Sequence, residues 1–131
     1  MALVRVLDSQ AVFGAVSAAE AVERTREAFL RHHAGEWVMP AKVYVDAPPA
    51  GDFRAMPARG DDLAILKWIS SFPGNPARGL PTVIGLLVVS DATTSQPLAL
   101  LDAGAVTALR TGAAAAVAAD ALAREGATTV G

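Results

Sequence analysis

Five short segments rich in branched and aromatic residues follow one another between residues 42 and 103, and they restrict the fold more than any other feature. They read KVYVDA, FRAMPA, LAILKWISS, TVIGLLVVSD and PLALLDA, and turns rich in Pro, Gly and Asp separate them, such as APPAGD and FPGNPARGLP. Consecutive strands with short links favour a mostly antiparallel or mixed sheet. A further edge strand is predicted at LVRVLD, near the N-terminus.

One helix is predicted between the N-terminal strand and the sheet segments. Ser17 is its candidate N-cap, Glu20 stands at the capping-box spacing and Gly35 is a stop. The apolar residues of this stretch gather near one side, so we expect an amphipathic helix that covers a sheet.

A second helix is predicted in the alanine-rich stretch from 102 to 126. Asp102 is its candidate N-cap and Gly126 its stop. Together the segments predict an α+β fold, a mixed or mostly antiparallel sheet covered by helices.

Composition narrows the class of protein. A chain of 131 residues fits one domain, and although 53% of its residues are hydrophobic, no charge-free run approaches the ~18 residues of a membrane-spanning helix. The N-terminal apolar run is too short for a signal peptide, so the cytoplasm is expected. The absence of cysteine excludes disulfides and thiolate sites, and the net charge of −2 does not favour nucleic-acid binding. A small molecule or a protein partner is therefore expected.

Four cationic residues indicate a binding site. Alternation along AILKWIS leaves Lys67 on a strand with no clearly exposed face, and Arg110 interrupts a helix of small apolar residues. Lys42 and Arg54 lie on neighbouring strand candidates. Such convergence without matching buried acids indicates a pocket for a carboxylate or a phosphate.

Each of these residues also has a plainer interpretation. A strand lysine at a sheet edge, or a helix arginine, commonly keeps its charge in water. Thr82 is either a ligand-facing hydroxyl or simply the first residue of a strand. His32 and His33 stabilise a helix end, and no metal site is predicted.

Three stretches, GDFRAMPA, LKWISSFPGNPARGLPTVIG and LDAGAVTALRTGAAAAVAADALA, resemble the first domain of the ornithine cyclodeaminase/μ-crystallin family. This family includes alanine dehydrogenases and ketimine reductases. The resemblance runs from about Met39 to the C-terminus, and ALRTGAA and GNP…GLPTV together make it specific.

The resemblance implies roles for individual residues. Lys42, Lys67 and Arg110 would grip the carboxylate of a small amino, imino or keto acid, with Lys67 as the catalytic residue. Thr82, Arg110 and Thr111 would reach NAD or NADP. The α-carbon of the substrate would then face the nicotinamide for hydride transfer.

The resemblance also implies a domain organisation. Residues 1–125 correspond to a domain that binds substrate and forms a homodimer. GATTVG, at 126–131, resembles the opening strand of a dinucleotide-binding domain, but no G-x-G-x-x-G follows. We therefore expect a fragment that is inactive alone and does not measurably bind NADH or NADPH.

Arg54 bears on the choice of substrate. Ornithine-cyclising members of the family carry an acidic residue at this position, and an arginine there repels a terminal ammonium. Alanine dehydrogenase or ketimine reductase chemistry is favoured over ornithine cyclisation. The alternative is a truncated, non-catalytic module for dimerisation or small-molecule binding.

Overall fold

The computed structural model describes residues 3–129 of the chain. Its elements follow the order β1 (Arg5–Leu7), α1 (Ser9–Ala15), α2 (Ala18–His33), β2 (Val43–Ala47), β3 (Gly51–Gly60), β4 (Leu63–Ser71), the short 3-10 helix η1 (Asn75–Arg78), β5 (Val83–Asp91), β6 (Pro97–Asp102) and α3 (Ala103–Leu122). All five predicted sheet segments form strands, and so does the N-terminal one.

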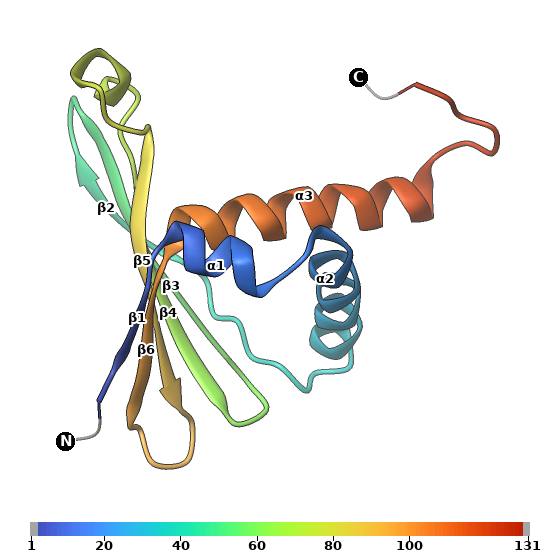
Figure 1. The fold of residues 1–131 in the computed structure, drawn as a ribbon, viewed down its shortest axis with the longest axis horizontal. Coiled ribbons are helices and arrows are strands. Elements are labelled where there is room, and N and C mark those ends of the chain that lie inside the picture. The colour runs from blue at the N-terminus through green and yellow to red at the C-terminus, as the bar shows by residue number, and fades with distance from the viewer. Residues whose placement is uncertain (1–2, 130–131) are drawn as a thin grey trace.

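The six strands form one mixed sheet in the order β1-β6-β5-β4-β3-β2. Strands β2 to β6 pair antiparallel with their sequence neighbours, as the short links predict, while β1 pairs parallel with β6 at the edge. Figure 1 shows the sheet edge-on, with α1, α2 and α3 on one side. The predicted α+β fold is therefore confirmed, and the helices leave one face of the sheet uncovered.

The described part of the chain contains one α-helix that the sequence pattern did not predict. Asp8 caps α1 by accepting a hydrogen bond from the backbone N–H of Ala11 at 2.8 Å. The helix has seven residues and packs on α3, β1 and β6. A segment this short holds few apolar repeats, so its stability comes from these contacts.

Helix α2 begins with the predicted capping box. The Ser17 hydroxyl accepts from the N–H of Glu20, and the Glu20 carboxylate accepts from the N–H of Ser17. The Ser17 hydroxyl also donates to the Glu20 carboxylate at 2.7 Å, and this bond, together with the one from the Ser17 N–H, lowers the pKa of Glu20. The helix ends before Gly35, which takes a φ of 77° as a stop residue does.

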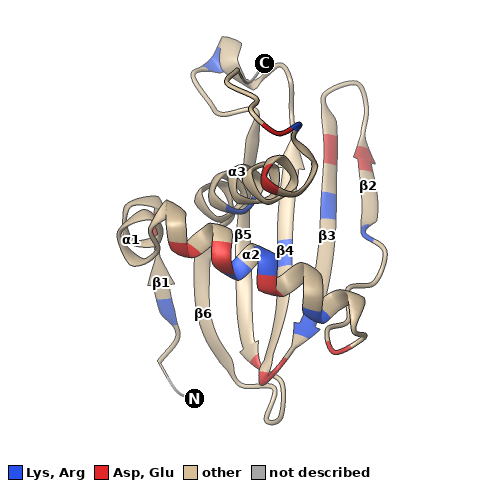
Figure 2. Ribbon diagram, turned by 90° about the vertical axis from the view of Figure 1, so that its right-hand side faces the viewer, with Lys and Arg blue, Asp and Glu red and all other residues tan. Residues whose placement is uncertain are grey.

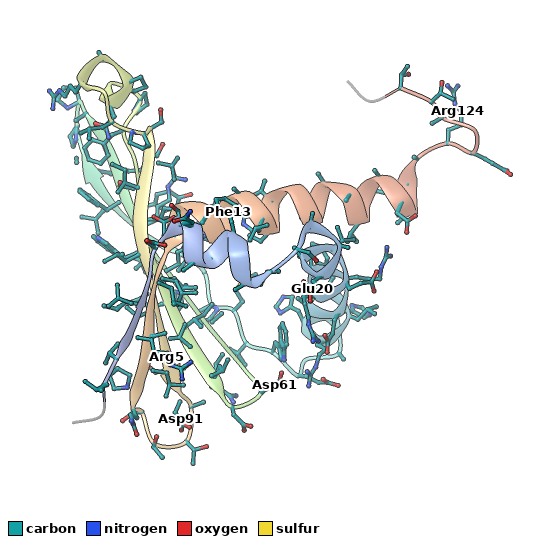
Figure 3. The ribbon with its side chains drawn as sticks, viewed as in Figure 1. Arg5, Phe13, Glu20, Asp61, Asp91 and Arg124 are labelled. Carbon is teal, nitrogen blue, oxygen red and sulfur yellow. The ribbon has the colours of Figure 1, made fainter. Side chains whose placement is uncertain are left out.

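The position of α2 differs from the prediction, because it packs against α3 and not on the sheet. Arg26 pairs with Asp120 of α3 at 2.8 Å. Arg31 pairs at 2.6 Å with Asp61 in the β3–β4 turn. Among residues 3–129, this is the one ion pair that connects the end of α2 to the strands. Figure 3 shows α2 beyond the sheet, with Asp61 at the turn that faces it.

Helix α3 crosses the covered face of the sheet. Asp102 is its N-cap, as predicted, and its carboxylate accepts from the N–H of Ala105 at 2.6 Å. The helix ends at Leu122, before the predicted stop at Gly126, and Leu122 is 83% exposed, so its last turn lacks packing. By length and composition alone α3 could also cross a membrane, but in this fold it packs on α2 and the sheet.

The two faces of the sheet differ in burial. Under α3, the core of Ile69, Leu87 and Ala103 is extended by partly buried side chains of Met56, Ile65, Val89, Leu101 and Val106. The uncovered face carries large exposed side chains, among them Leu66, Trp68, Ile84 and Leu86, which are 40–52% exposed. We call these four residues the open-face patch.

Residues 126–129 follow α3 without forming a strand, and residues 130 and 131 lie outside the described residues. The expected start of a second domain at 126–131 therefore stays a prediction.

Candidate carboxylate-binding site

A pocket of about 160 Å³ lies where strands β3 and β4 meet the first half of α3. Figure 2 shows basic positions on β3, β4 and just before β2 beside this helix. The pocket is lined by Lys42, Arg54, Met56, Lys67, Ile69, Ser70, Ser71, Val83, Thr107 and Arg110. All four cations singled out in the sequence therefore line one cavity. It is smaller than the ~300–1,000 Å³ of common ligand pockets, which suits a small acid.

Lys67 is the most buried of the four cations. It points from the middle of β4 toward α3, with only 9% of the residue exposed. Its ammonium donates a hydrogen bond to the Thr107 hydroxyl at 3.3 Å. Burial, with the nearby charges of Arg110 and Lys42, lowers the pKa of Lys67. A buried cation that faces other cations is stabilised when an anion binds beside it.

Arg54 differs from the other cations because it has an acidic partner. Its Nε and Nη2 atoms donate to the two carboxylate oxygens of Asp52, at 2.5 and 3.0 Å. These hydrogen bonds raise the pKa of Arg54 and lower that of Asp52. The Arg54 guanidinium also lies 5.3 Å from the ring centroid of Tyr44. The expectation of cations without matching acids thus needs correction for Arg54.

Lys42 and Arg110 are both exposed and line the pocket from opposite elements, the segment before β2 and helix α3. Within residues 3–129, neither of them nor Lys67 takes part in an ion pair. The pocket thus presents three cations that form no ion pair within the described residues, although the charge of Asp52 acts on Lys42. Two of them, Lys67 and Arg110, approach from different sides, as the binding of one carboxylate requires.

The two threonines expected to reach the cofactor do not line this pocket. Thr82 immediately precedes β5, and its carbonyl accepts from the N–H of Phe72 at 2.8 Å. Thr111 is exposed on α3, next to Arg110. A hydroxyl and a guanidinium on one exposed helical turn are donors that fit a dinucleotide pyrophosphate, so their expected role stays a prediction.

Three further residues shape the site and were missed in the sequence. Asp52 stands two positions before Arg54 on β3, so strand alternation alone puts it on the same face. Tyr44 lies directly opposite Arg54 in the β2–β3 register. Thr107 precedes Arg110 by three residues, the spacing that shares a helix face. The sequence spacing alone indicates that Asp52 shares a face with Arg54, and that Thr107 shares a face with Arg110.

Comparison with known proteins agrees with this geometry. The sequence profile of the "Ornithine cyclodeaminase/mu-crystallin family" matches residues 4–131. The chain belongs to this family. The match includes every residue that lines the pocket, and it confirms the resemblance carried by the GNP…GLPTV and ALRTGAA segments.

Individual members of the ornithine cyclodeaminase/mu-crystallin family are close in sequence and structure. The alanine dehydrogenase of Archaeoglobus fulgidus is 44% identical over 126 residues, which is 96% of this chain and 39% of that protein. A solved archaeal alanine dehydrogenase dimer with bound NAD superposes with a TM-score of 0.92 at 43% identity, covering 95% of this chain and 39% of that one.

A second solved structure is the Δ1-pyrroline-2-carboxylate reductase of Thermococcus litoralis in complex with NADH and L-proline. It has a TM-score of 0.89 and 31% identity, over 92% of this chain and 38% of that chain. The present chain therefore spans less than half the length of the relatives it matches.

Proposed function

We propose that this chain forms the substrate-binding part of an NAD(P)-dependent oxidoreductase that acts on a small 2-amino, 2-imino or 2-oxo acid. The observation that carries the proposal is the pocket in which Lys42, Lys67 and Arg110 converge without an ion pair among residues 3–129. Alanine dehydrogenase or ketimine reductase chemistry is favoured, because Arg54 at the same pocket presents only hydrogen-bond donors, which a second ammonium on the substrate cannot use.

The chain's own residues bind and orient the substrate. The Lys67 ammonium and the Arg110 guanidinium hold the carboxylate from the sheet side and the helix side, and Lys42 adds a third charge at the rim. Met56 and Ile69 provide apolar contacts beside it. Holding the acid in one orientation contributes to catalysis by positioning, and Lys67, with its lowered pKa, releases a proton more readily than an exposed lysine.

The cofactor is proposed to be NAD or NADP, which supplies or accepts the hydride when bound. The alanine dehydrogenase and reductase structures that resemble this chain contain NAD and NADH. In this chain, Thr82, Arg110 and Thr111 are the residues proposed to contact the dinucleotide. Most of its binding site is proposed to lie in a second, dinucleotide-binding domain, with residues 1–125 as the substrate domain.

The open-face patch supports a homodimer. The archaeal alanine dehydrogenase of similar fold is a dimer. Here Leu66, Trp68 and Leu86 leave a broad apolar surface on the sheet, which two copies would bury against each other. We place the enzyme in the cytoplasm, where NAD(P) and small 2-oxo acids are available.

An activity panel tests the proposal. The protein that carries this chain together with a dinucleotide-binding domain is assayed with NADH or NADPH against three substrate sets: 2-oxo acids with ammonium, cyclic imino acids, and the diamino acids ornithine and lysine. We expect turnover of the first or second set and little of the third. A protein that turns over none of them, yet forms a stable dimer, would instead be the non-catalytic dimerisation or binding module.

A further inference from the structure

Among the four pocket cations, Arg54 is the one that a carboxylate holds through two hydrogen bonds in the described residues. The two oxygens of Asp52 occupy its Nε–H and one Nη2–H, and the ring of Tyr44 lies 5.3 Å from its guanidinium carbon. Lys42 and Arg110 have no carboxylate partner in the described chain. Arg54 therefore has one orientation before any ligand arrives.

The strand geometry accounts for this arrangement. Asp52 and Arg54 are two residues apart on β3, so their side chains leave the same face of the sheet. Tyr44 is the cross-strand partner of Arg54, and Asp46 that of Asp52. Arg54 lines the pocket, while Asp52 does not: it borders a separate hollow at the β2–β3 turn. Asp52 thus reaches the pocket through its hydrogen bonds to Arg54, and its charge also acts on nearby Lys42.

The ion pair changes what Arg54 offers to a substrate. Its charge is largely offset by Asp52, but the Nη N–H groups that Asp52 does not use remain as fixed donors. A preorganised guanidinium fork binds a planar acceptor with little loss of side-chain freedom. It also presents a rigid, donor-only surface, which a substrate ammonium cannot approach with a hydrogen bond.

We propose that Asp52 is a positioning residue that, by fixing Arg54, makes the site select short neutral or acidic side chains over cationic ones. This inference rests on the proposed function, because it identifies the substrate class of the same pocket. In this proposal the Asp52 carboxylate, which does not line the pocket and contacts no substrate atom, contributes to substrate specificity.

The test uses Asp52→Asn and Asp52→Glu in the full enzyme. The matched control is Asp46→Asn, which removes a carboxylate at the cross-strand position without touching Arg54. Relative kcat/KM is measured for pyruvate, with ammonium, and for ornithine. We expect Asp52→Asn to reduce the pyruvate-to-ornithine preference by roughly ten- to a hundredfold, mainly through KM for pyruvate, because a mobile Arg54 no longer presents aligned donors. Asp52→Glu should restore part of the preference, and the control should match wild type.

A second measurement is independent of turnover. In ¹H–¹⁵N spectra, the Arg54 Nε–H should give a slowly exchanging signal in the wild type and in Asp46→Asn, and a rapidly exchanging one in Asp52→Asn. An unchanged signal and an unchanged substrate preference in Asp52→Asn would overturn the inference. Inactivity of the wild type on every 2-oxo and imino acid would instead contradict the proposed function, while the Arg54 signal would still decide whether Asp52 fixes this residue.

Discussion

At the scale of single residues, the ammonium of Lys67 donates a hydrogen bond to the Thr107 hydroxyl at 3.3 Å. The charges of Arg110 and Lys42 lie close enough to act on it. Its lowered pKa makes the stability of the empty protein depend on pH. Between this lowered value and the ordinary value of 10.5, the unfolded chain binds more protons than the folded one, so the free energy of unfolding rises with pH.

We therefore predict that the free energy of unfolding rises less steeply with pH in Lys67→Met than in the wild type. At neutral pH the variant should be at least as stable as wild type, because it lacks the buried charge, and the difference should narrow as the pH rises toward 10.5. Urea unfolding at a series of pH values measures this. A Lys67→Met protein that is much less stable at neutral pH would show that the lysine has a structural partner.

Arg54→Glu gives a second prediction at this scale. The change puts two carboxylates side by side on β3, where an ion pair now lies, and provides an acceptor for a substrate ammonium. We expect lower thermal stability together with a shift of kcat/KM from pyruvate toward ornithine. The neutral variant Arg54→Gln should lose the ion pair without gaining ornithine turnover. Equal preferences in the two variants would contradict the proposal that the residue at position 54 selects against a substrate ammonium.

At the scale of elements, the start of α3 connects the fold to the site. Asp102 caps this helix through the N–H of Ala105, and the next turns carry Thr107 and Arg110 into the pocket. Loss of the cap should therefore affect both stability and substrate binding.

We predict that Asp102→Ala destabilises the protein by about 0.5–2 kcal/mol, the usual effect of losing an N-cap. It should also raise the KM for pyruvate, while Asp102→Asn, which caps equally well, should stay close to wild type in both respects. Thermal melts and steady-state kinetics check this. A KM increase of the same size in Asp102→Asn would mean that the charge of Asp102, rather than the helix cap, matters for binding.

Elements differ in how far the sequence predicted them. The strands were predictable because turns rich in Pro and Gly separate them, and the caps of α2 and α3 because Ser17 and Asp102 stand at readable positions. Helix α1 and the packing of α2 on α3 were not, since both depend on tertiary contacts. At the pocket, convergence of the four cations was predicted, but the Arg54–Asp52 pair was overlooked, although strand alternation implies it.

At the scale of the whole molecule, the uncovered sheet face carries the exposed apolar side chains of the open-face patch, which a second copy is proposed to cover. Leu86 lies on β5, one of the two central strands of the sheet, and is 52% exposed. Figure 1 shows α1, α2 and α3 all on the opposite side of the sheet.

We predict that Leu86→Glu converts the proposed homodimer to a monomer, because the proposed interface would then bury an unpaired carboxylate. Leu122→Glu, at an 83% exposed position at the end of α3, is the matched control and should remain dimeric. Sedimentation velocity distinguishes the two states. A dimer that persists in Leu86→Glu would place the interface elsewhere.

The central claim is that the cations of the pocket serve a substrate carboxylate and not the fold. The most direct test measures kcat/KM for pyruvate and the melting temperature of Lys67→Met in the full enzyme. Leu66→Met is the control, a neighbouring change on the open face of the same strand. Loss of a charge-assisted contact of about 1.5–3 kcal/mol predicts a roughly ten- to hundredfold lower kcat/KM, with the melting temperature unchanged or higher. A marked fall in melting temperature with unchanged kcat/KM would show that Lys67 is structural and would contradict the account.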